Sequence, residues 1–277
     1  MKRNWRIIVF ICALTGLWIF MAPGLRADLS GEEKQDLFSK AKETFRNANE
    51  AAADDPRQAE DLYRQSVMRF ERLVREGGIQ NGKLYYNIGN GYFRMKDLGR
   101  AILNYRKAKR YITGDPNLAQ NLAYARSRCR DRIEIQARAQ ILKTVLFWHY
   151  DLSPHIRSII FVSFFMIFWT GAAVRLFRKG AVPRWILVLA GIIALLFLGS
   201  VIAGSVHQYR NIPGVILADE VTARKGDGDN FEPAFKNPLH EGTEFTLVEK
   251  RNEWYQVELN DSRRCWVPKN SAGLVRE

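Results

Sequence analysis

Residues able to carry catalysis or bind a metal are sparse and scattered along the chain. The four histidines are His149, His155, His207 and His240, and none lies at a ligand spacing from a cysteine or a carboxylate. Gly89-Asn90-Gly91 resembles part of a phosphate loop, but no Gly-Lys-Ser/Thr follows it. No Ser-His-Asp arrangement can be defined. We therefore expect a protein that is not an enzyme and that uses no cofactor or metal.

Polar side chains at helical spacing offer binding chemistry instead. One stripe of a predicted helix carries Lys83, Tyr86, Asn87, Asn90 and Arg94. The N–H donors of lysine, asparagine and arginine suit a carboxylate or an acidic peptide. A merely solvated polar face would have the same residues, and the pattern alone leaves both interpretations open.

The helix that carries this stripe must pack through its other side. Residues 84–108 predict two helices with a turn at 96–99, which makes Gly99 a turn residue. The predicted packing positions are Tyr85, Ile88, Gly89, Tyr92, Ala101, Tyr105 and Ala108. Their order and spacing resemble a tetratricopeptide repeat, in which Gly89 would let the partner helix approach. Gly91 has no explanation from its position.

The flanking segments match this repeat more loosely. We expect an all-α tetratricopeptide-repeat solenoid over residues 28–140. The resemblance implies that the polar stripe lines a concave, peptide-binding groove. Residues 125–139 hold five arginines, which fit either a solvated helix or an anionic partner.

Three apolar runs predict how the chain meets a membrane. Residues 1–27 begin with basic side chains, continue through an apolar run and end at a small residue, as in a signal peptide; a retained anchor is the alternative. Residues 158–174 and 185–206 are uncharged and long enough to span a bilayer. Residues 141–157 predict an amphipathic interfacial segment.

The loop between the two predicted spans, residues 175–184, sets their orientation. It holds Arg175, Arg178, Lys179 and Arg184 and no acidic residue, which indicates the cytoplasmic side. Both flanking segments are then extracytoplasmic. The chain has 42 Lys+Arg against 29 Asp+Glu, a formal charge of +13. Much of the excess lies beside apolar runs, so we expect membrane binding and no nucleic-acid partner.

The tail, residues 212–277, changes to a strand pattern. Strands are predicted at 215–218, 244–249, 254–259 and 264–268. Val221-Thr222-Ala223-Arg224, Leu239 to Thr243, Trp254 to Val257 and Trp266-Val267 together resemble a bacterial SH3 domain, which implies a small all-β barrel. Trp254, Tyr255 and Trp266 could flank a peptide or cell-wall groove, or fill the barrel core. Cys129 and Cys265 fall in different predicted domains, so no disulfide framework is expected.

The whole order of signal, repeats, two spans and SH3-like tail resembles the BatE family of bacterial Bat (aerotolerance) clusters. The resemblance is firmest over residues 84–108 and 147–153. It implies von Willebrand factor A domain membrane proteins and a BatD-like protein as partners, with a MoxR-type ATPase acting indirectly. We expect a scaffold at the bacterial inner membrane with both large domains periplasmic. An envelope sensor or tether that binds peptidoglycan through the SH3-like domain is the alternative.

Overall fold

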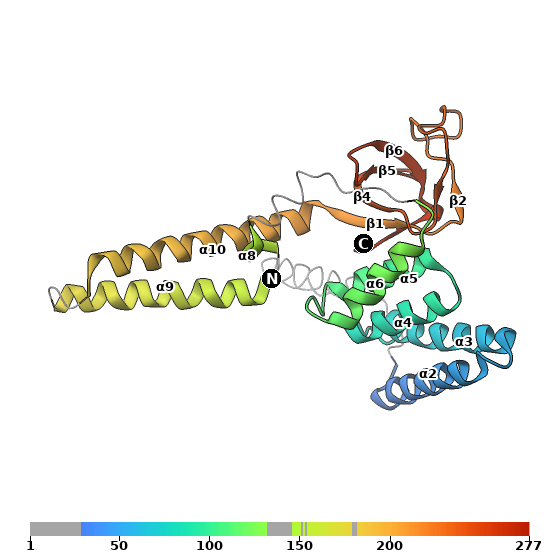
Figure 1. Ribbon diagram of the computed structural model, residues 1–277, viewed down its shortest axis with the longest axis horizontal. Coiled ribbons are helices and arrows are strands. Elements are labelled where there is room, and N and C mark those ends of the chain that lie inside the picture. The colour runs from blue at the N-terminus through green and yellow to red at the C-terminus, as the bar shows by residue number, and fades with distance from the viewer. Residues whose placement is uncertain (1–28, 132–145, 151, 153, 179–181, 277) are drawn as a thin grey trace, which may run out of the picture. The chain divides into compact units, whose positions relative to one another are not determined.

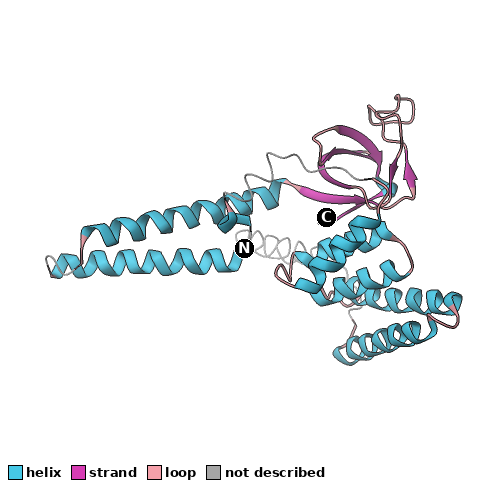
Figure 2. Cartoon of the chain, viewed as in Figure 1, coloured by secondary structure: helices cyan, strands magenta, loops and turns pink. Residues whose placement is uncertain are grey.

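The computed structural model describes residues 29–131, 146–150, 152, 154–178 and 182–276. The chain divides into two compact units, with the boundary between Gln80 and Asn81, inside the range predicted as one repeat domain. The predicted signal peptide and residues 141–145, 151 and 153 of the predicted interfacial segment lie outside the described residues. Figure 1 labels most of the helices and strands, and Figure 2 separates helices from strands by colour.

The described part of the first unit is a helical hairpin of α2 (Gly31–Ala51) and α3 (Pro56–Arg75). Ser30 begins α2 with a capping box, because its side chain accepts from the Glu33 amide while its own amide donates to the Glu33 carboxylate. The buried Ser66 hydroxyl of α3 donates to the Ala41 carbonyl of α2 at 2.7 Å. Phe70 and Leu73 bury the apolar side of α3.

The second unit begins with three helices that an acid or amide side chain caps in turn. They are α4 (Gly82–Arg94), α5 (Leu98–Lys109) and α6 (Pro116–Arg128), and their N-caps are Asn81, Asp97 and Asp115. Each cap side chain accepts hydrogen bonds from backbone N–H groups of the first turn, which have no acceptor within the helix. The short α4–α5 turn places Lys96 at a positive φ of 66°.

Two glycines of this region are required by close contacts. A Cβ at Gly89 would lie 2.6 Å from the Tyr105 ring, so α4 and α5 approach closely there. Gly99 is not a turn residue as predicted, because it is the second residue of α5. A Cβ at Gly99 would lie 2.7 Å from the Ile216 carbonyl oxygen. The absence of a side chain at Gly99 therefore lets the backbone at Ile216 pack directly against α5. Nothing in the structure explains Gly91.

Two further helices are long and apolar enough to cross a membrane. α9 (Pro154–Phe177) follows the short α8 (Phe147–Tyr150) and runs beside α10 (Arg184–Arg210), as Figure 1 shows. Only 6% and 17% of their apolar windows are buried, unlike the core helices of a soluble protein. Arg157 of α9 donates to the Ser200 carbonyl of α10 at 3.0 Å. This pair of helices is compatible with a two-span membrane protein.

The tail folds into an antiparallel five-stranded sheet. Its strands are β1 (Ile212–Ile216), β4 (Glu244–Arg251), β5 (Trp254–Leu259), β6 (Arg264–Pro268) and β7 (Ala272–Leu274), in the order β6-β5-β4-β1-β7. The short β2 (Glu220–Val221) and β3 (Leu239–His240) pair separately, and the 3-10 turn η1 (Lys269–Ser271) joins β6 to β7.

The predicted small barrel is an open sheet and not a closed barrel, because the two edge strands β6 and β7 do not pair. The outer edge of β6 is occupied by another segment. Arg224 and Trp266 exchange both backbone N–H···O bonds at 2.8 Å, which leaves no edge at this point for β7. β7 instead pairs with β1, opposite Gly214 to Ile216.

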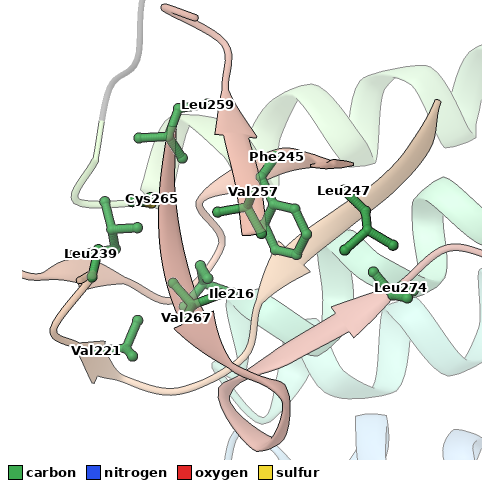
Figure 3. Close-up of a cluster of buried hydrophobic side chains, with 11 residues drawn as sticks. Ile216, Val221, Leu239, Phe245, Leu247, Val257, Leu259, Cys265, Val267 and Leu274 are labelled. Carbon is green, nitrogen blue, oxygen red and sulfur yellow. The ribbon is translucent and has the colours of Figure 1, made fainter. Parts of the chain in front are cut away.

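One apolar core lies between the five-stranded sheet and the β2–β3 pair. Side chains from both contribute to it, as Figure 3 shows: Ile216, Val221, Ala223, Leu239, Phe245, Leu247, Val257, Leu259, Cys265, Val267 and Leu274. Alternate residues of β6, Cys265 and Val267, point into this core, as the period of a strand requires.

Candidate interaction surfaces

The stripe predicted on α4 divides into an exposed set and a hydrogen-bonded set. Lys83 and Arg94 are exposed, and Asn87 is half-buried. Tyr86 and Asn90 bond to neighbouring helices instead. The exposed residues are the ones accessible to a partner.

A polar network holds Tyr86 and Asn90 in place. Tyr105 of α5 donates its hydroxyl proton to Asn90 Oδ1 at 2.8 Å. Asn121 of α6 donates to the Tyr86 hydroxyl at 2.8 Å and to Asn90 Oδ1 at 3.1 Å. Burial raises the pKa of Tyr105, so its hydroxyl stays protonated and remains a donor. The network fixes α4 beside α6.

The surface shared by α4 and α6 is basic and aromatic, and neither helix contains an acidic residue. Tyr124 is 48% exposed on α6, and its ring centroid lies 5.6 Å from that of Phe93 on α4. The Arg128 guanidinium lies over the same tyrosine ring at 5.0 Å. Such a surface can donate hydrogen bonds to a carboxylate and stack against apolar atoms beside it.

The seven predicted packing residues lie mostly inside the helical layer. Tyr85, Ile88, Gly89, Ala101, Tyr105 and Ala108 are buried, and Tyr92 is half-buried. The Tyr105 ring therefore serves two purposes, since it packs against Gly89 and donates to the network.

The three aromatic residues predicted in the tail have different environments. Trp266 is 6% exposed but lies outside the main apolar core, with the Arg251 guanidinium 5.2 Å over its ring. Tyr255 is half-buried between the ammonium groups of Lys250 and Lys269, each within 6 Å of its ring centroid. Trp254 is half-buried on the same strand.

A contact between the helices and the sheet was not predicted from the sequence. Glu244 of β4 accepts from Arg106 of α5 and, at 2.5 and 3.0 Å, from Arg126 of α6. Glu241 accepts from the amides of Leu98 and Gly99 at 3.1 and 3.3 Å, at the start of α5. This acid caps the positive end of a helix, where an anion is favourable.

In a further contact the acid comes from the helical side, as Asp131 directly after α6, and the donors come from the tail. The Asp131 carboxylate accepts from the His240 amide at 2.8 Å and from the Thr243 hydroxyl at 2.6 Å. Burial raises the Asp131 pKa, but these donors outweigh it and the pKa lies below its ordinary value. Residues 240–244 therefore contact the start of α5 through Glu241 and the residue Asp131, which follows α6, through His240 and Thr243.

The Glu244 carboxylate stays ionised although its side chain is only 11% exposed. Burial raises its pKa, but the Arg126 hydrogen bond and the charges of Arg106 and Arg126 bring it below the ordinary value. Burial lowers the pKa of Arg106, and Glu244 opposes that shift. The guanidinium remains a cation because its unperturbed pKa is above 12.

The two described cysteines are buried free thiols. Cys129 directly follows α6 and lies against Gly242, where an added Cβ would be 2.3 Å from the Cys129 sulfur. Gly242 has a φ of +82°. Burial raises the pKa of Cys129 to about 11 and that of Cys265 to about 12. Both thiols are therefore poor nucleophiles at neutral pH. Among the described residues, no group of three or more His, Cys, Asp or Glu side chains could hold a metal ion.

Comparison of the chain with family models, curated proteins and solved structures finds no match.

Proposed function

We propose that the chain is a non-enzymatic scaffold of the bacterial inner membrane, anchored by α9 and α10 with its helices and sheet in the periplasm. The observation that carries this proposal is the basic, acid-free surface of α4 and α6, which exposes Lys83 and Arg94 beside Asn87. Such a surface suits an acidic peptide or a carboxylate-rich partner. In this proposal α4 and α5 form a tetratricopeptide repeat and the sheet is an SH3-like domain.

The resemblance to the BatE family supplies the partners of this proposal. They are von Willebrand factor A domain membrane proteins and a BatD-like protein, with a MoxR-type ATPase connected indirectly. The contact through Glu244 supports a scaffold, because it joins the helices to the sheet as one binding platform.

Partner capture by the full-length protein in mild detergent, read by mass spectrometry, tests the proposal. The variant combines Lys83→Ala, Asn87→Ala and Arg94→Ala. It spares Tyr86 and Asn90, because both belong to the internal network. The control combines Arg57→Ala, Arg75→Ala and Asn230→Ala, three exposed positions elsewhere.

We expect wild type and control to recover von Willebrand factor A domain membrane proteins equally. The variant should recover them at least about tenfold less, because the loss of even one charge-assisted hydrogen bond is worth ~1.5–3 kcal/mol. Equal recovery by the variant would contradict binding at this surface. Recovery of peptidoglycan enzymes alone, insensitive to the variant, would favour the alternative, an envelope sensor or tether that binds cell wall through the sheet.

A further inference from the structure

A basic pocket opens between α5 and the first and last strands of the sheet. Its volume is about 280 Å³, near the lower end of the ~300–1,000 Å³ typical of small-ligand sites. Three arginines line it: Arg106 of α5, Arg110 directly after α5, and Arg276 after β7. Pro213 and Val275 give it an apolar part. The pocket shares no residue with the surface of α4 and α6.

The pocket carries a net positive charge. Arg106 shares Glu244 with Arg126, so two guanidinium groups face one carboxylate. The Arg110 guanidinium donates to the Val275 backbone carbonyl at 3.2 Å, an acceptor that does not neutralise its charge. None of the described residues that line the pocket is acidic. An anion entering the pocket would meet the charge of Arg110 and of the pair Arg106 and Arg126, which exceeds the single negative charge of Glu244.

The chain itself places this pocket close to the end of a membrane-spanning helix. The apolar span of α10 ends at Val206, and the helix continues to Arg210. Asn211 follows directly and lines the pocket. Five residues of helix rise at most about 8 Å. The headgroup layer is roughly 5–8 Å deep on each side of the hydrocarbon. Asn211 therefore lies at the depth of lipid headgroups when α10 spans the membrane.

We propose that this pocket binds the phosphate group of an anionic phospholipid. Arginine presents planar pairs of N–H donors that match phosphate oxygens, and an excess of cations favours a lipid without a compensating ammonium group. This inference rests on α10 as a membrane span, which belongs to the proposed function, but not on partner binding at α4 and α6. A lipid bound there would hold α5 and the neighbouring strands β1 and β4 at the membrane surface.

Calorimetric titration of the full-length protein in neutral detergent tests this site. The probes are dihexanoyl phosphatidylglycerol, dihexanoyl phosphatidylcholine and sodium phosphate. The variant combines Arg110→Gln and Arg276→Gln, and it leaves Arg106 in place because Glu244 depends on that arginine. The matched control combines Arg263→Gln and Arg264→Gln, two exposed arginines paired with neighbouring acids on the same sheet. Melting curves establish that each variant is folded.

We expect the phosphatidylglycerol probe to bind at least about tenfold more tightly than either other probe. The variant should weaken it about tenfold or more, since a basic residue near an anionic surface is worth ~1 kcal/mol and tenfold corresponds to 1.4 kcal/mol. The control should bind as wild type does. Equal affinity for phosphatidylcholine, or full affinity in the folded variant, would overturn the proposal. Equal affinity for sodium phosphate would replace the lipid with a free anion.

This titration and the partner capture fail independently. Loss of partner recovery in the α4 variant with intact phosphatidylglycerol binding would support both proposals. A wild-type chain that binds phosphatidylglycerol but recovers none of the proposed partners would support the lipid pocket and contradict the scaffold.

Discussion

At the residue scale, Glu244 is the side chain on which the contact between the helices and the sheet most depends. Its removal leaves Arg106, only 24% exposed, without its carboxylate. Breaking a buried ion pair from one side costs ~3–5 kcal/mol, and we expect Glu244→Ala to fall near the lower limit because Arg126 is half-exposed. Cys129 reports the loss, since its thiol lies against Gly242. A loss of about 3 kcal/mol raises the population in which the contact is open by about 100-fold, so maleimide labelling of Cys129 should accelerate by about the same factor.

The labelling is measured at pH 8 in a Cys12→Ser, Cys265→Ser background, so that Cys129 is the one reporter. Glu249→Ala is the matched control, because this acid pairs with Arg251 within the sheet. Its labelling rate should equal that of the unsubstituted background. If Glu244→Ala labels no faster than Glu249→Ala, the carboxylate does not hold the contact closed.

Gly99 makes a second prediction at this scale. Alanine would improve helix propensity by ~1 kcal/mol, but its Cβ would lie 2.7 Å from the Ile216 backbone oxygen, which cannot turn away as a side chain could. Overpacking of this kind costs ~1–3 kcal/mol. We expect Gly99→Ala to lower the melting temperature by about 3 °C or more. Gly114→Ala, with open space around it, should not lower it.

At the element scale, the contact of α5 and α6 with the sheet should weaken in acid. Asp131 and Glu244 have lowered pKa values in the folded chain, so their stabilisation is present above the unfolded values of ~4 and is lost as the pH falls below them. Burial raises the pKa of Glu241, whose contribution has the opposite sign. Because Asp131 and Glu244 together should outweigh Glu241, we expect the melting temperature to fall between pH 5 and 3.

The Glu244→Gln variant separates the contribution of one acid from this pH dependence. Glutamine cannot titrate, so the fall in melting temperature between pH 5 and 3 should be smaller than in wild type. Glu258→Gln, which removes an acid paired with Arg264 inside the sheet, serves as the control. An unchanged pH dependence in Glu244→Gln would mean that other groups cause the acid sensitivity.

The paired helices α9 and α10 depend on a small residue at their contact. A Cβ at Gly171 would lie 2.6 Å from a Leu187 methyl group, whereas nothing lies within 4 Å of one at Gly199. A leucine at 171 should therefore separate the helices, since spanning helices gain stability from close packing at small residues. We expect Gly171→Leu, but not Gly199→Leu, to lower the sodium dodecyl sulfate fraction at which the helices unfold.

How much could be predicted from the sequence depended on how local each interaction is. Strands β5 and β6 are confirmed at 254–259 and 264–268, because alternation and aromatic content are properties of the segment itself. The three-residue β7 was not predicted, since its pairing with Gly214 involves a distant part of the chain. The predicted barrel does not close, because Arg224, from another part of the chain, occupies the edge of β6.

The candidate surface shows the same limit. The α4 stripe could be predicted from helical spacing, but the spacing could not separate Lys83 and Arg94, which are exposed, from Asn90, which bonds to Asn121 on another helix. The role of Glu244 depends on arginines more than a hundred positions away. No local pattern in the sequence indicates that pairing.

At the scale of the whole molecule, the arrangement of basic residues should decide which side of the membrane each part occupies. Residues 175–184 hold four basic residues and no acid, and such loops stay in the cytoplasm. Reporter fusions after Gly180 and after Glu277 should therefore lie on opposite sides. Alkaline phosphatase should be active only at the second position, and a fluorescent protein that folds in the cytoplasm only at the first.

Replacing Arg175, Arg178, Lys179 and Arg184 by glutamine tests the cause of this orientation. Loss of the positive charge removes the bias that holds the loop inside, so phosphatase activity after Glu277 should fall and activity after Gly180 should rise. Replacing Arg57, Arg64, Arg72 and Arg75, which lie on α3, is the control and should change neither signal. Equal reporter signals at Gly180 and Glu277 in the wild-type chain would refute two spans. That result would also contradict the proposal that the pocket binds a phospholipid, because Asn211 would then have no fixed depth in the membrane.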